Sequence, residues 1–148
     1  MDRLSFSISE SSSEQIFSHL SLCDEDFIPP LSSRLNVMLY AQKLARRAIR
    51  FECWHEQELV GMVAVYHSDD TREAFITSVS VRADFRHKGV AKHLLGLALA
   101  FGDERSILRS HLEVNRESEG ARRLYGYFGF APISEDETIL AMVRPRPL

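Results

Sequence analysis

Eight consecutive residues, Leu59 to Tyr66, are almost all apolar. A strand of this composition is covered on both faces, so it belongs in the centre of a sheet. Further along, a β-branched run at 74–81 is followed by a helical pattern at 89–102 and another strand pattern at 107–114. This order predicts a parallel pair of strands joined by a right-handed crossover. A ligand is expected where the first of these strands leads into the helix.

Shorter elements surround this unit. The expected strands are 4–9, 50–54, 59–67, 74–81, 107–114 and two within 130–143, joined near 134–137; the expected helices are 12–20, 35–49, 89–102 and 118–128. Gly102 is expected to end its helix, and the two prolines of residues 144–148 to keep this tail out of the sheet. The order β-α-α-β-β-β-α-β-α-β-β predicts a single mixed α/β (α+β) domain over residues 1–148.

Composition and charge exclude several classes of protein. Lys and Arg number 18 against 21 Asp and Glu, so no global positive field attracts nucleic acid or anionic lipid. No basic start with an apolar stretch and no membrane-length run is present, so we expect a cytoplasmic protein without nucleic-acid or membrane partners, monomeric or homodimeric. Cys23 and Cys53 are isolated thiols, which predicts buried side chains and no metal site.

Residues 86–91, Arg-His-Lys-Gly-Val-Ala, open the helix expected at 89–102. The unpaired N–H groups and partial positive charge of a helix N-terminus attract phosphate, and Gly89 allows a ligand to approach the chain closely. Arg86, His87 and Lys88 add positive charge at the rim. This segment therefore predicts a phosphate-binding loop. Taken alone, the short motif also fits a solvated basic turn.

A second segment makes the first one specific. Val79-x-Val81 with Arg86-x-x-Gly89-x-Ala91 resembles the acetyl-CoA motif Q/R-x-x-G-x-G/A of the GNAT superfamily of N-acetyltransferases. The superfamily's later motif is matched, at the same spacing, by Leu112-Glu113-Val114, Ala121, Leu124-Tyr125 and Gly129-Phe130. The resemblance covers about residues 58 to 130, and the element order extends it over nearly the whole chain. It implies a GNAT-like fold with a central mixed, mostly antiparallel sheet.

For the acyl donor, the resemblance implies acetyl-CoA as co-substrate and no metal. It assigns the pyrophosphate to backbone N–H groups of Arg86, His87, Lys88, Gly89, Val90 and Ala91. The main chain at Val79 and Val81 would pair with the pantetheine arm, and one N–H there would polarise the thioester carbonyl. Ser118 stands where relatives usually have an Asn that contacts the cofactor arm, so this contact is expected to be shorter or lost.

For the chemistry, Tyr125 matches the family's frequent general acid, the phenol that meets the departing thiolate. The alternative is that Tyr125 only packs the core, because it shares a helical face with Ala121, Leu124 and Phe128. A phenol near pKa 10 protonates a thiolate near 8.5 uphill by about 2 kcal/mol, so a strong hydrogen bond is expected.

The general base stays open at this stage. Residues 74–81 contain no carboxylate, and their polar side chains are Thr77, Ser78 and Ser80. Glu113 is a candidate, although its position matches a Glu that is often structural in the family. Further candidates, each expected to be structural or exposed, are His111, Glu73 and Tyr66.

The family places the acceptor between the first two helices and the late hairpin. The residues expected there include Phe27, Pro30, Leu31, Arg34 and Tyr40. The leading hypothesis is an acetyl-CoA-dependent N-acetyltransferase in which a primary amine, on a small molecule or a protein, attacks the thioester directly in a ternary complex. The alternative is a catalytically silent CoA-binding or sensing module, which the missing carboxylate and Ser118 would support.

Overall fold

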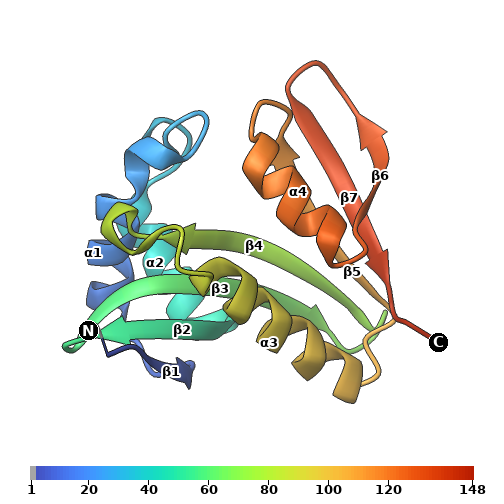
Figure 1. Cartoon of the computed structure of the whole chain (residues 1–148). Helices are drawn as coiled ribbons and strands as arrows, with labels where there is room; N and C mark the ends of the chain where they lie inside the picture. The colour runs from blue at the N-terminus through green and yellow to red at the C-terminus, as the bar shows by residue number, and fades with distance from the viewer. Residues whose placement is uncertain (1–2) are drawn as a thin grey trace.

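One seven-stranded sheet, in the order β1-β2-β3-β4-β5-β7-β6, runs through the protein (Figure 1). The computed structural model describes residues 3–148 apart from the side chain of Glu135; residues 1 and 2 of the single domain expected over 1–148 lie outside the described residues. The strands are β1 (Ser5–Ile8), β2 (Ile49–His55), β3 (Glu58–Ser68), β4 (Glu73–Val81), β5 (Arg109–Asn115), β6 (Ala131–Glu135) and β7 (Ile139–Pro145). The helices are α1 (Ser13–Leu22), α2 (Val37–Arg47), α3 (Val90–Glu104) and α4 (Glu119–Tyr127), with short 3-10 turns η1 (Asp24–Asp26), η2 (Leu31–Ser33) and η3 (Ala83–Phe85).

The expected mixed, mostly antiparallel sheet is confirmed. Strands β4 and β5 are parallel, and every other neighbouring pair among the described residues is antiparallel. Helices α1 and α2 cover one face of the central strands, and α3 covers the other (Figure 1). Along β3, Met62 packs with the α1–α2 core and Val63 with the α3 core, which explains the continuous apolar run of this strand.

Helix α3 approaches the sheet closely at its first turn. A Cβ placed on Gly61 of β3 would lie 2.8 Å from Cγ1 of Val90, a separation that real side chains do not adopt. Val90 and Leu94 are buried in the same core, so the N-terminal turn of α3 is held firmly against β3. The loop that precedes α3 therefore has a fixed position beside the end of β4.

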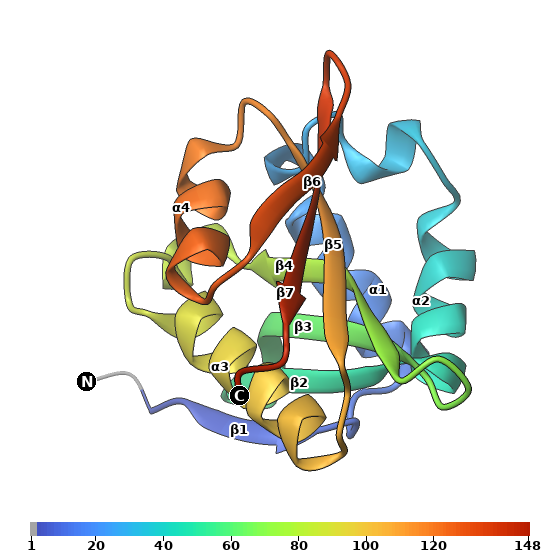
Figure 2. The ribbon, with the colours of Figure 1, turned by 90° about the vertical axis from the view of Figure 1, so that its right-hand side faces the viewer.

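Strands β4 and β5 pair only briefly and then diverge. Their parallel register covers residues 73–75 of β4 and 109–111 of β5. In its other pairing, β4 has a bulge at Thr77, because Ser78 faces Ala64 while Ile76 faces Val65. A bulge bends a strand and increases its twist. In Figure 2, β5 and β7 run upright with α4 beside them, whereas β2, β3 and β4 run across the view. Among the described residues, β5 does not pair with β4 from Ile76 onward.

A buried ion pair on β2 anchors helices α1 and α2 to the sheet. Arg50 and Glu52 of β2 lie 3.3 Å apart, and both are almost fully buried. Arg50 also donates to the carbonyl oxygens of Leu44 and Ala48 at the end of α2, and Glu52 accepts from the backbone N–H of Ser11 ahead of α1. These bonds satisfy carbonyls at a helix end and compensate the buried charges. The unit formed by α1 and α2 is thus tied to β2 just before α1 begins and where α2 ends.

Gly102 does not end its helix as predicted. Helix α3 continues to Glu104, and the chain turns at Ser106, which has a φ of +61°. Gly102 lies buried in the last turn, where a Cβ would come within 3.6 Å of Ile107. A Cβ there would make ordinary van der Waals contact with Ile107, and the left-handed residue that follows the helix is Ser106 and not this glycine.

The prediction for residues 144–148 is also wrong in part, because β7 continues through Pro145. Arg146 donates its backbone N–H to the carbonyl of Leu108, so the nitrogen of the preceding Pro145 points away from β5. On that other side β6 no longer pairs, since its register with β7 stops at Val143. The missing N–H of proline therefore leaves no ladder bond unmade.

Within residues 3–148, no helix has the length and apolar character that a bilayer crossing requires. Cys23 and Cys53 are buried free thiols. The described residues contain no cluster of three or more His, Cys, Asp or Glu side chains placed to hold a metal ion.

Candidate active site

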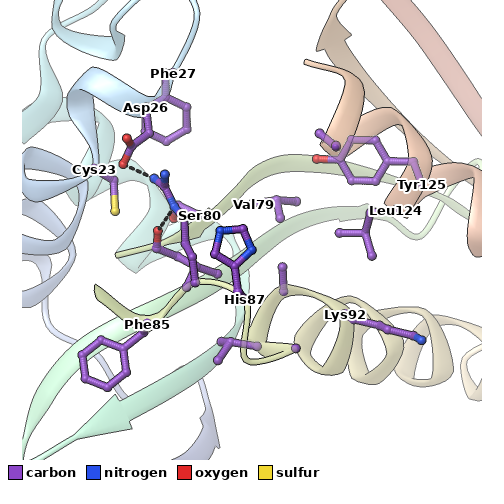
Figure 3. Close-up of a pocket in the computed structure, with 17 residues that line it drawn as sticks. Cys23, Asp26, Phe27, Val79, Ser80, Phe85, His87, Lys92, Leu124 and Tyr125 are labelled. Atoms are coloured by element: carbon purple, nitrogen blue, oxygen red, sulfur yellow. Dashed lines mark hydrogen bonds and ion pairs between the residues drawn. The ribbon is translucent and has the colours of Figure 1, made fainter. Parts of the chain in front are cut away.

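Two cavities lie where β4 leaves β5. The helix-side cavity, of about 500 Å³, lies between the end of β4, the start of α3 and α4 (Figure 3). The loop-side cavity, of about 350 Å³, lies between the η1–η2 segment and strands β4 and β5. Both cavities are lined by the same five residues: Asp26, Phe27, Val79, Ala121 and Tyr125. These shared residues form a junction between the cavities.

The helix-side cavity contains a ready anion site at the start of α3. Gly89 precedes the helix with a φ of +77°, and no side chain caps the helix there. His93 is the first α3 residue whose N–H reaches back to Gly89, which leaves the N–H groups of Val90, Ala91 and Lys92 without a partner in the helix. A Cβ on Gly89 would have no described atom within 4 Å, so the space in front of this turn is open. The residues fit a phosphate group.

The open edge of β4 forms another wall of this cavity. Val79, Ser80 and Val81 line it, and their backbone lies beyond the last residue pair that β4 makes with β5. An extended chain can therefore add to β4 as a further strand, since the edge has free hydrogen-bonding groups. Together with the α3 start, this wall fits a long, phosphate-bearing molecule such as an acyl-CoA.

Most of the residues predicted to bind the acyl donor lie around the helix-side cavity in the structure. Those that line it are Val79, Val81, Arg86, His87, Gly89, Val90, Ala91 and Tyr125. Lys88 does not line it, and Ser118 lies in the wall of the loop-side cavity.

Tyr125 lies at the junction. Only 7% of the residue is exposed, and its ring packs against Phe130 with 6.0 Å between the centroids. In Figure 3 its hydroxyl points across the opening toward the wall with Phe27 and Asp26, and it makes no hydrogen bond to a described residue. Burial raises the pKa of Tyr125 to about 12, so the phenol is protonated at neutral pH. The ring thus belongs to the core while the hydroxyl is free to donate.

The β4 residues that line the loop-side cavity include polar side chains but no carboxylate. Tyr40 and Thr77 share a hydrogen bond of 2.7 Å between their hydroxyl groups, and burial raises the pKa of Tyr40 to about 12. Ser78 is 6% exposed, and its Oγ has no partner among the described residues. Of the five residues predicted to bind the acceptor, the cavity includes Phe27, Leu31, Arg34 and Tyr40 but not Pro30.

The candidate bases lie in different places. Glu113 is exposed on β5 and lines the loop-side cavity. Glu73 accepts a hydrogen bond from His111 (Oε1 to Nε2, 2.8 Å) and another from Arg109, at the start of the β4–β5 pairing and away from both cavities. Tyr66 packs against the α1–α2 core and lines neither cavity. Glu113 is therefore the one of these four that reaches a cavity.

Two features of the site had no signal in the sequence. Asp26 of η1 lies at the junction and forms an ion pair with Arg86 of the phosphate loop. His19 of α1 lies beneath β4, with Nδ1 3.1 Å from the carbonyl of Leu59 and Nε2 2.8 Å from Oγ of Ser80. Since a carbonyl can only accept, Nδ1 carries the proton and Ser80 donates to Nε2. Both residues gain these positions through partners far away in the chain.

An opened sheet beside an uncapped helix start, with a free phenol where two cavities meet, defines a group-transfer site for a phosphate-bearing donor. The sequence model of the acetyltransferase (GNAT) family matches residues 14–130. The chain therefore belongs to the GNAT acetyltransferase family, whose members use CoA-based substrates. A search among curated proteins finds no significant match.

Solved structures share this fold. Nourseothricin acetyltransferase is 27% identical over 68% of this chain, which spans 66% of that protein, with a TM-score of 0.60. PaiA N-acetyltransferase from Thermoplasma acidophilum, solved in complex with coenzyme A, is 15% identical over 95% of this chain and 99% of its own, with a TM-score of 0.72. Ard1 from Thermoplasma volcanium is 22% identical over 97% of this chain and 99% of its own, with a TM-score of 0.77.

Proposed function

We propose that this protein transfers an acetyl group from acetyl-CoA to a primary amine by direct attack in a ternary complex. The observation that carries the proposal is the junction, where the helix-side and loop-side cavities share five residues. A donor in the helix-side cavity and an amine in the loop-side cavity would meet there. Holding two reactants in contact in this way is a large part of what such an enzyme supplies.

The donor side supplies binding and polarisation. The N–H groups at the start of α3 hold the pyrophosphate, and the backbone of Val79 and Val81 pairs with the pantetheine arm. A backbone N–H of this open stretch donates to the carbonyl oxygen and stabilises negative charge that develops there. Acetyl-CoA supplies the activated acetyl group as a thioester.

Tyr125 acts as a hydrogen-bond donor to the leaving sulfur. With a pKa of about 12 against about 8.5 for an ordinary thiol, full proton transfer is uphill by about 5 kcal/mol. The phenol therefore stabilises the developing thiolate by a hydrogen bond, and the released amine proton completes the charge balance.

A covalent acyl-cysteine is disfavoured. Burial raises the pKa of the Cys23 thiol to about 11, and Cys53 has a pKa of about 11 for the same reason. A thiol attacks as the thiolate, which is scarce at neutral pH for such groups. Cys53 also lies outside both cavities.

The test measures acetyl-CoA turnover on a broad panel of amines. Release of the CoA thiol is the readout, and the wild-type protein is compared with Tyr125→Phe. Loss of the hydroxyl should lower kcat by about 100-fold, while CoA affinity changes far less. Tyr127→Phe is the matched control, since Tyr127 lies on the same helix, is 67% exposed and lines neither cavity. An equal effect of both substitutions would remove Tyr125 from the mechanism.

The same assay separates the alternative. CoA binding by the wild-type protein without turnover on any amine would favour a silent CoA-binding module. This alternative is tested because β4 contributes no carboxylate to the loop-side cavity. Absence of CoA binding would reject the enzyme and the module alike.

A further inference from the structure

We propose that Asp26 binds the ammonium group of the acceptor, and that Arg86 occupies this carboxylate until the donor's pyrophosphate draws Arg86 away. The inference rests on the proposed acetyl transfer and adds the residue that recognises the amine. It also gives a physical link between donor binding and acceptor binding.

The position of Asp26 is the first observation. Its residue lines both cavities, and in Figure 3 its carboxylate lies on the wall opposite the Tyr125 hydroxyl. Val79, whose backbone belongs to the proposed polarising stretch, lines the same two cavities. An ammonium bound at Asp26 would thus lie at the junction where the thioester is proposed to react.

The charges of the two cavities single out this residue. Among the described residues that line either cavity, the carboxylates are Asp26 and Glu113. Glu113 lines only the loop-side cavity, whereas Asp26 lines both cavities. Among the described residues, Asp26 is also the one carboxylate that lines the helix-side cavity, where the donor's pyrophosphate is proposed to bind. A carboxylate there opposes donor binding unless a cation, first Arg86 and then the amine, compensates it.

The contact between Arg86 and Asp26 is suited to exchange. Arg86 donates to the Val81 carbonyl (Nε to O, 3.3 Å) and forms an ion pair with the Asp26 carboxylate. The two side chains are 38% and 34% exposed, and ion pairs of such exposure are weak. A pyrophosphate at the adjacent helix start carries more charge and offers paired oxygens to the guanidinium. Donor binding would therefore free Asp26 for the amine, and each ligand would favour the other.

The experiment compares Asp26→Asn with Glu25→Gln, a neighbouring exposed carboxylate that lines neither cavity. With CoA as the calorimetric probe, Asp26→Asn should bind about fivefold more tightly, because it removes both the competitor for Arg86 and a repelling charge. Glu25→Gln should bind CoA as the wild type does. With the best amine of the panel, Asp26→Asn should raise KM by about tenfold or more and change kcat less, and Asp26→Glu should recover part of that loss.

The outcomes separate the two proposals. Unchanged CoA affinity in Asp26→Asn overturns the exchange of Arg86, and an unchanged amine KM overturns the binding role. If the wild type binds CoA but acetylates no amine, the proposed function fails, and the CoA affinities still decide the exchange. Asp26→Ser provides a second neutral variant if Asp26→Asn does not fold, as judged by its thermal unfolding.

Discussion

His19 of α1 is only 1% exposed, and both of its ring nitrogens are hydrogen-bonded. Burial lowers its pKa from 6.5 to about 4. The unfolded chain therefore takes up a proton below about pH 6.5, whereas the folded protein does so only near pH 4. The free energy of unfolding should fall as the pH drops through this window, by about 3 kcal/mol in all from this residue.

Urea unfolding of the wild type and of His19→Gln between pH 7.5 and pH 5 measures this effect. Glutamine has no proton to gain, so the wild type should lose its advantage as the pH falls, by about 2 kcal/mol at pH 5. Other titrating groups contribute equally to both proteins and cancel in the difference. Parallel pH profiles would show that His19 binds its proton as readily in the folded protein as in the unfolded chain.

Single residues also mark the limit of sequence interpretation. Tyr125 and Gly89 were accessible from the sequence because each occupies a fixed place in a local motif. Asp26 was not, since nothing in the run Asp24-Glu25-Asp26 distinguishes the carboxylate that reaches the junction. Its contact with Arg86 depends on how η1 and the phosphate loop meet in space.

At the scale of the element, the start of α3 combines an open N-terminus with a left-handed glycine. Gly89→Asn should lower CoA affinity by about tenfold or more, because its side chain would fill open space at the helix start where the pyrophosphate is proposed to bind. The free energy of unfolding should fall by less than about 1 kcal/mol, since asparagine tolerates a φ of +77° better than other residues with a side chain.

Calorimetry with CoA and urea unfolding test this pair of effects. Gly126→Asn is the control, because Gly126 is exposed on α4, has ordinary helical backbone and lines neither cavity. Gly126→Asn should leave CoA affinity unchanged. If Gly89→Asn lost stability and affinity in proportion, Gly89 would be a requirement of the fold and not of the ligand.

Elements were predicted well where local patterns decide them, and less well at their ends. The continuous apolar run of β3 and the periodic patterns of the strand-helix-strand unit are set by side chains within a few residues of one another. Gly102 and Pro145 were misjudged because features outside the local pattern decide the outcome: the left-handed residue that follows α3 is Ser106, and the pairing of β6 stops before the proline.

At the scale of the molecule, the divergence of β4 from β5 leaves backbone N–H groups exposed to a ligand. Addition of CoA should slow hydrogen exchange in residues 76–81 and 90–92, since a bound donor would supply acceptors to both stretches. Strand β2, which is paired on both sides, should exchange at the same rate with and without CoA. Protection of 90–92 without 76–81 would mean that the pantetheine arm does not run along β4.

The sequence by itself determined the fold class and the central strand, and it predicted a phosphate-binding loop, because hydrophobic patterning and the polarity of a helix start act over short stretches of chain. The tertiary structure decided where the chemistry can take place. Asp26, Val79 and Tyr125 come from three distant segments and meet only because β4 bulges and separates from β5. Burial at that junction then raises the pKa of Tyr125, an effect that no local pattern contains.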